Sequence, residues 1–258
     1  MGFGAAVDDQ DSSKTQKALP KVSKLKQLKE DLFMNCADYP FQVDRIVGGE
    51  NATIGEFPWQ AALAFKSGGT FCGGTLILEK FVITAAHCIQ FKSPESVLIV
   101  LGDHDLYQTD PGEVTHEVKK WIIHHSYNRS SADYDIAIIE LKEPVKINKF
   151  IDTACLPMIE PNDEKTVLIS GWGSTRQKNV SISRNKQDSS ILQKAAVNIV
   201  ERKKCQEKYD VPNNIYGQTG EITDRMICAA SEGKDACQGD SGGMKLLNRL
   251  KVIYMYTI

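Results

Sequence analysis

From residue 46 onward, the apolar residues of this chain gather into short segments separated by turn residues. The strand-sized segments lie at residues 61–65, 75–84, 97–101, 118–123, 136–141 and 167–170. Runs of this length, interrupted by Gly68-Gly69, Pro111-Gly112 and Gly171, predict strands rather than helices. The pattern therefore predicts an all-β fold, a sandwich or a barrel. Because no run reaches the roughly 18 residues of a membrane helix, we do not expect a membrane partner.

The size and charge of the chain narrow the class of protein further. It has 258 residues, enough for one large domain or two small ones, and its net charge is −2. That balance argues against a basic nucleic-acid binder. Residues 1–45 differ in character, because acidic residues and then spaced lysines replace the apolar segments. We interpret 1–45 as a partly disordered leader and 46–258 as the folded domain.

Cysteine usage indicates the compartment. The chain has seven cysteines and no C-x-x-C pair of the kind that zinc sites use. Disulfides are the better interpretation, and they imply an oxidising environment. Three glycosylation sequons agree with secretion, beginning at Asn51, Asn128 and Asn179. The first thirty residues contain no apolar stretch followed by a cleavage site, so no signal peptide is visible.

Three motifs carry side chains that could act together in catalysis. Residues 84–88 place His87 after an apolar strand, Asp135 leads into another strand, and residues 235–243 surround Ser241 with glycines. Each has an ordinary structural explanation by itself: a structural histidine, a strand-start aspartate and a glycine-rich turn. Together they supply a base, an orienting carboxylate and a nucleophile, which only folding could bring into contact.

At these residues the chain resembles the trypsin-like serine proteases of the chymotrypsin family. The resemblance runs from Arg45 to Gly243 and includes A-A-H-C, D-I-A-I and G-D-S-G-G. It also covers the segments R-I-V-G-G from Arg45, F-P-W-Q from Phe57 and G-W-G from Gly171. Such a resemblance implies two packed antiparallel β-barrels with the active site between them.

The resemblance also implies a role for each site residue. Ser241 would attack a peptide carbonyl, His87 would accept its proton, and Asp135 would orient the imidazole. The backbone N–H groups of Gly239 and Ser241 would form the oxyanion hole. Asp235 would lie at the base of the specificity pocket and favour substrates with Arg or Lys. No cofactor is required.

Activation and cross-linking are implied in the same way. Cleavage between Arg45 and Ile46 would create an ammonium group that pairs with Asp240, so the uncut chain would be a zymogen. The implied disulfides are Cys72–Cys88, Cys205–Cys228 and Cys36–Cys155, which leave Cys237 without a partner. The acidic loop that contains Asp103, Asp110 and Glu113 is either a calcium site, as in the family, or a solvated loop.

The sequence departs from the family after Gly243. Residues 244–258 do not match the usual ending, although 252–256 could form one strand, and we therefore expect a truncated or atypically ended chain whose second barrel is incomplete. We expect a secreted serine endopeptidase zymogen whose partners are a protein or peptide substrate, an activating protease and a serpin-type or other protease inhibitor. Two alternatives stay open: a non-catalytic protease-like binding or regulatory protein, and an unstable fragment.

Overall fold

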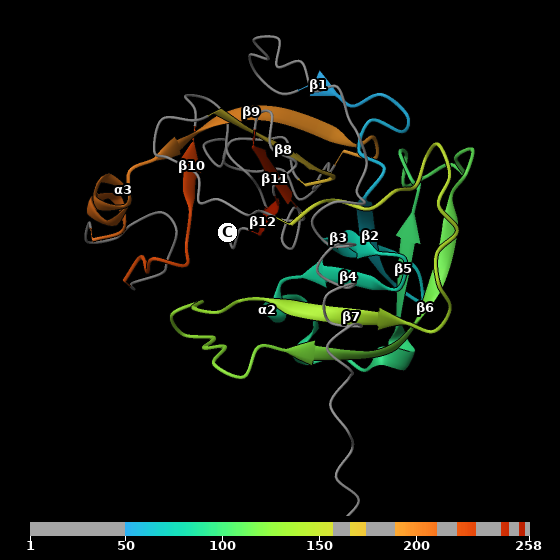
Figure 1. The fold of residues 1–258 in the computed structure, drawn as a ribbon, viewed down its shortest axis with the longest axis horizontal. Coiled ribbons are helices and arrows are strands. Elements are labelled where there is room, and N and C mark those ends of the chain that lie inside the picture. Colours follow the sequence, from blue (N-terminus) through green and yellow to red (C-terminus); the bar gives the residue numbers. More distant parts are fainter. Residues whose placement is uncertain are drawn as a thin grey trace, which may run out of the picture.

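The computed structural model describes residues 50–156, 166–173, 189–210 and 221–230, together with the backbone of two strands at 244–247 and 253–255. It contains a closed six-stranded barrel and a second, six-stranded sheet (Figure 1). The all-β prediction is confirmed, and the second sheet is open among the described strands. The predicted leader and the activation junction lie outside the described residues.

The first barrel closes through antiparallel pairs in the order β2-β3-β4-β7-β6-β5. Its strands are β2 (Gln60–Phe65), β3 (Thr70–Leu78), β4 (Phe81–Thr84), β5 (Val97–Leu101), β6 (Val114–Ile123) and β7 (Ala137–Leu141). Alternate residues of a strand face opposite sides, and in β5 the side chains of Val97, Ile99 and Leu101 are fully buried. The apolar interior of the barrel thus follows from the period-two pattern of the sequence.

A close approach of strands inside the barrel depends on one glycine. A Cβ atom on Gly74 would lie 2.9 Å from Cγ1 of Val82 and 3.0 Å from Cδ1 of Leu63. Both of those side chains are completely buried, so they have little room to move. A side chain at position 74 would therefore push against the packed interior.

The second sheet has the order β1-β9-β8-β11-β12, and β10 pairs with β9. Its strands are β1 (Glu50–Asn51), β8 (Thr166–Gly171), β9 (Gln193–Val200), β10 (Cys228–Ala230), β11 (Met244–Leu247) and β12 (Ile253–Met255). One face carries a separate apolar cluster of Val167, Ile169, Val197 and Ile199. The opposite face contributes Leu168 and Ala196 to the core of the first barrel.

Three short helices complete the described part of the chain. The α-helices are α2 (Ala86–Ile89) and α3 (Arg202–Tyr209), and η1 (Pro94–Ser96) is a 3₁₀ turn. None of the described helices has both the length and the apolar character that crossing a bilayer requires.

One strand prediction needs revision, and another is confirmed. The apolar run at 75–84 forms two strands, because Glu79 and Lys80 make a turn between β3 and β4. Their polar side chains interrupt the run and are better accommodated at the surface. The predicted strand within 252–256 is present as β12, and β11 precedes it although it was not predicted. β11 pairs with β8 in antiparallel register, so this edge of β8 is hydrogen-bonded.

Hydrogen bonds and a shared core join the barrel to the second sheet. The carbonyl of His104 accepts hydrogen bonds from the indole of Trp172, at 3.1 Å, and from the backbone N–H of Leu192, at 2.8 Å. The hydroxyl of Ser170 donates to Oε1 of Gln60 at 2.8 Å in a buried position. Trp172 and Leu192 also belong to the barrel's apolar core, so the two units pack as one body (Figure 1).

Candidate active site

The register between β4 and β7 brings two of the predicted catalytic residues together. In this antiparallel pair, Thr84 at the end of β4 lies opposite Ala137 at the start of β7. His87 follows Thr84 by three residues and Asp135 precedes Ala137 by two. The chain therefore leaves one strand and enters the other at the same end of the barrel, with the histidine and the aspartate side by side.

His87 and Asp135 make two hydrogen bonds. The imidazole Nδ1 lies 2.6 Å from Oδ2 of Asp135, and the backbone N–H of His87 donates to Oδ1 at 2.8 Å. The Asp135 side chain is 2% exposed, whereas that of His87 is 30% exposed. A buried carboxylate needs such donors to remain charged. With Nδ1 bonded to Asp135, Nε2 is the ring nitrogen that would exchange a proton with a nucleophile.

The local structure holds His87 in this position. A disulfide joins Cys88, on the single turn of α2, to Cys72 on β3. The hydroxyl of Thr84 donates to the carbonyl of Gly73 at 2.8 Å, which fixes the end of β4 against β3. Short strand-end turns would otherwise be mobile, and these cross-links limit the movement of the imidazole.

The other predicted site residues lie outside the described residues. These are Ser241, Gly239, Asp235, Asp240, Arg45 and Ile46, so their roles remain predictions. Cys205 in α3 is bonded to Cys228 in β10, which is the pair that the family resemblance implied. Cys155 is also disulfide-bonded, and its predicted partner, Cys36, falls outside the described part of the chain, as does Cys237.

The three carboxylates proposed for calcium converge in the loop after β5. Asp103, Asp110 and Glu113 offer oxygen atoms that all lie within 4.8 Å of one another. Burial, and then the negative charges of Glu113, Asp110 and Asp105, raises the pKa of Asp103 to about 7. Its buried Oδ1 has no hydrogen-bond partner within the described residues. Oxygen ligands of this charge suit Ca²⁺, so the residues present fit the ion.

The contacts of the loop that precedes Asp135 could not be identified from the sequence. Asp133 lies two positions before it and forms an ion pair with Arg225, from the second sheet's side of the molecule. Asp133 is close in sequence to the predicted Asp135, but Arg225 is 92 residues from Asp133 and belongs to no motif. Its place could be found only from the folded chain.

A closed β-barrel that holds a buried carboxylate against a histidine, beside a second sheet, has the architecture of a chymotrypsin-type hydrolase. The sequence matches the trypsin family over residues 46–253. It is 39% identical to trypsin beta of Drosophila erecta, over 77% of this chain and 72% of that protein. It is 40% identical to transmembrane protease serine 9 of Rattus norvegicus, over 77% of this chain but only 18% of that protein.

A solved structure supports the same assignment. Mouse neuropsin, a serine protease, aligns with a TM-score of 0.66 and 32% identity, over 81% of this chain and 84% of that chain. The chain therefore belongs to the trypsin family of serine proteases.

Proposed function

We propose that this protein is a secreted serine endopeptidase zymogen that hydrolyses peptide bonds after Arg or Lys. The observation that carries the proposal is the 2.6 Å contact between Nδ1 of His87 and the buried carboxylate of Asp135. A histidine that is both oriented by a carboxylate and partly exposed is suited to act as a general base. Ser241, in the G-D-S-G-G segment, is the expected nucleophile, and its membership of the range that matches the trypsin family supports this role.

The proposed reaction is acyl transfer. His87 would take the proton from the Ser241 hydroxyl through Nε2 while the oxygen attacks the substrate carbonyl. Asp135 would stabilise the imidazolium that forms, because its carboxylate already contacts Nδ1. The N–H groups of Gly239 and Ser241 would stabilise the oxyanion, and water would later hydrolyse the acyl-enzyme.

Substrate choice is assigned to Asp235. A carboxylate in a partly desolvated pocket requires a cation, and a substrate guanidinium or ammonium would supply it. We therefore propose cleavage after Arg or Lys. The partners that follow from this are a protein or peptide substrate and a serpin-type or other protease inhibitor.

Activation is assigned to cleavage between Arg45 and Ile46 by an upstream protease, with Asp240 receiving the new ammonium group. The described disulfides Cys72–Cys88 and Cys205–Cys228 support an oxidising, extracellular location. The sequons at Asn51 and Asn128 lie at exposed positions, which supports glycosylation there.

Asp103, Asp110 and Glu113 would hold Ca²⁺, whose charge would offset the repulsion among the three carboxylates. The ion is assigned a stabilising role in this loop. It takes no part in the acyl transfer.

A fluorophosphonate probe tests the activity. Purified full chain should react slowly before cleavage and rapidly after a protease generates the Ile46 terminus, with the label found on Ser241. S241A is the control that keeps the fold and loses the label. If confirmed cleavage gives no labelling, the protein is instead a non-catalytic protease-like binding protein.

Specificity is tested separately with matched peptide substrates. The activated chain should cleave after Arg and Lys and not after Phe, and Asp235→Ser should abolish the preference for cations. Equal cleavage after Phe and Arg in the unmodified chain would exclude the proposed role of Asp235.

A further inference from the structure

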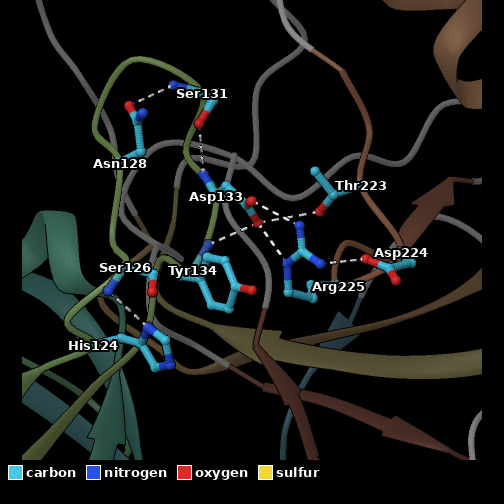
Figure 2. A network of polar contacts seen from close by, with 9 residues as sticks. All are labelled: His124, Ser126, Asn128, Ser131, Asp133, Tyr134, Thr223, Asp224 and Arg225. Carbon is cyan, nitrogen blue, oxygen red and sulfur yellow. Dashed lines mark hydrogen bonds and ion pairs between the residues drawn. The ribbon is translucent and has the colours of Figure 1, made fainter.

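A second ion pair lies directly beside the catalytic candidate Asp135. Nε of Arg225 donates to Oδ1 of Asp133 at 3.0 Å, and Nη2 donates to Oδ2 at 2.8 Å. The Thr223 hydroxyl donates to Oδ1 at 3.2 Å. Figure 2 shows the guanidinium of Arg225 reaching the carboxylate of Asp133 from the segment that precedes β10. Asp133 thus receives three side-chain donors from beyond its own loop.

The two partners come from different units of the molecule. Asp133 belongs to the loop that enters β7 of the barrel, whereas Arg225 precedes β10 of the second sheet. An exposed ion pair usually contributes little to stability, because solvent screens it. The contribution of this pair is geometric instead, because the guanidinium engages both carboxylate oxygens in a fork, with the side chains of Arg225 and Asp133 40% and 18% exposed.

The backbone next to Asp133 has a conformation that needs support. Ala132 and Tyr134 have φ values of 54° and 53°, in the left-handed region that residues other than glycine seldom adopt. A residue in this region is strained and persists only where the surroundings hold it. Tyr134, the second of these strained residues, directly precedes Asp135.

Arg225 also holds the aromatic ring of this loop. The Tyr134 ring stacks on His124 at 4.5 Å between centroids, and the Arg225 guanidinium carbon lies 4.5 Å from the centroid of the Tyr134 ring. One arginine therefore contacts the two residues that immediately precede Asp135, one through hydrogen bonds and one through its ring.

We propose that Asp133 and Arg225 form a clamp that positions the Asp135 carboxylate against His87. The clamp fixes the loop at residues 132–134, and this fixes where the next carboxylate lies relative to Nδ1. Asp133 and Arg225 are positioning residues, because no step of the reaction touches them. The kinetic consequence rests on the proposed function, whereas the effect on the histidine–aspartate contact does not.

Proton NMR of the uncut full chain tests the positional effect without any need for activity. The Nδ1 proton in the His87–Asp135 hydrogen bond should give a low-field signal in the unmodified chain. In D133N and R225Q the bond should loosen, so that the signal moves upfield and its exchange with solvent accelerates about tenfold. D224N is the matched control: it removes the other carboxylate bonded to Arg225, at 2.6 Å, and leaves the contact with Asp133. Its signal should not change.

Kinetics of the activated chain provide the second measurement. D133N and R225Q should lower kcat roughly tenfold, because a small misplacement of a catalytic group is costly, while KM stays nearly constant. R225K keeps the charge but cannot form the fork. Its kcat should therefore fall between that of the unmodified chain and that of R225Q. Thermal melts identify any variant that fails to fold. If D133N or R225Q does not fold, the NMR measurement is made on R225K instead.

The outcomes separate the two proposals. An unchanged Nδ1 signal in both folded variants overturns the clamp, even if the unmodified enzyme is fully active. A displaced signal in a cleaved chain that does not react with a fluorophosphonate supports the clamp and excludes the proposed protease function. A loss of stability with an unchanged signal and unchanged kcat would show that the ion pair is only structural.

Discussion

Asp135 accepts hydrogen bonds from the backbone N–H and from Nδ1 of His87, and its side chain is almost completely buried. The carboxylate is therefore placed to set the orientation and the tautomer of the imidazole. A neutral amide at this position would keep the shape of the side chain and lose the charge. It would also offer a donor to Nδ1 where the bond requires an acceptor.

We accordingly expect Asp135→Asn to fold normally and to lower kcat by about 10⁴-fold, a magnitude borrowed from the trypsin-like catalytic template itself. The measurement is hydrolysis of an arginyl ester by the activated variant. Asp210→Asn, at the exposed end of α3, is the control and should change kcat by less than about twofold. A fully active Asp135→Asn enzyme would rule out the orienting role.

Among the structural elements, the loop before β7 is stabilised by the charges of Asp133 and Arg225. The hydrogen bond from Arg225 lowers the pKa of Asp133 from its ordinary value. Because the folded pKa lies below the unfolded value, the ion pair stabilises the fold at neutral pH. That stabilisation is lost as the pH falls through the unfolded value of about 3.9 towards the lower folded pKa.

Urea unfolding of the unmodified chain and of D133N tests this dependence. The difference between their free energies of unfolding should be largest near neutral pH and should shrink as the solution becomes more acidic than the unfolded pKa. R225Q should remove the same pH-dependent part. A difference that is equal at neutral and acidic pH would show that the charge of Asp133 contributes nothing.

The loop after β5 should respond to calcium. With the three carboxylates close together, Ca²⁺ at about 100 times its Kd would stabilise the fold by about 2.7 kcal/mol. For a domain of this size that corresponds to a rise in Tm of roughly 5–10 °C. D103N should reduce this rise and, by removing one repelling charge, should increase Tm in the absence of calcium. An equal Tm with calcium and with a chelator would exclude the site.

Much of the barrel could be predicted from sequence, because β5 and β7 follow the period-two pattern of buried residues closely. Other elements could not. The sequence of α3, RKKCQEKY, has no apolar face, and only Cys205, which a disulfide holds, is buried. β9 interleaves Lys194 and Asn198 with apolar residues, so its strand character depends on the neighbours β8 and β10.

In the candidate site, too, some residues could be predicted from the sequence and others could not. His87 and Asp135 could be predicted because their motifs resemble a known family. The partnership of Asp133 with Arg225 could not, because long-range pairing of charged residues depends on how two sheets pack and leaves no local pattern. The hairpin turn at Glu79 and Lys80 was missed because the apolar residues on each side extend the run across it.

For the whole molecule, the shared core predicts one cooperative transition. Trp172 and Leu192 from the second sheet's side pack with the interior of the first barrel, and His104 binds both of them through its carbonyl. Calorimetry and tryptophan fluorescence should therefore report the same Tm. Two separate transitions would show that the barrel and the sheet unfold independently, and no transition at all would indicate an unstable fragment.

The pairing of Thr84 with Ala137 has a consequence for variation among related chains. His87 and Asp135 lie three and two residues from this pair, so inserting or deleting a single residue between the pair and either side chain would separate them. Changes of length in the turns at the opposite end of β4 and β7 would not move the two side chains apart. Homologous sequences should accordingly vary in length at that far end and keep strict spacing at the near one.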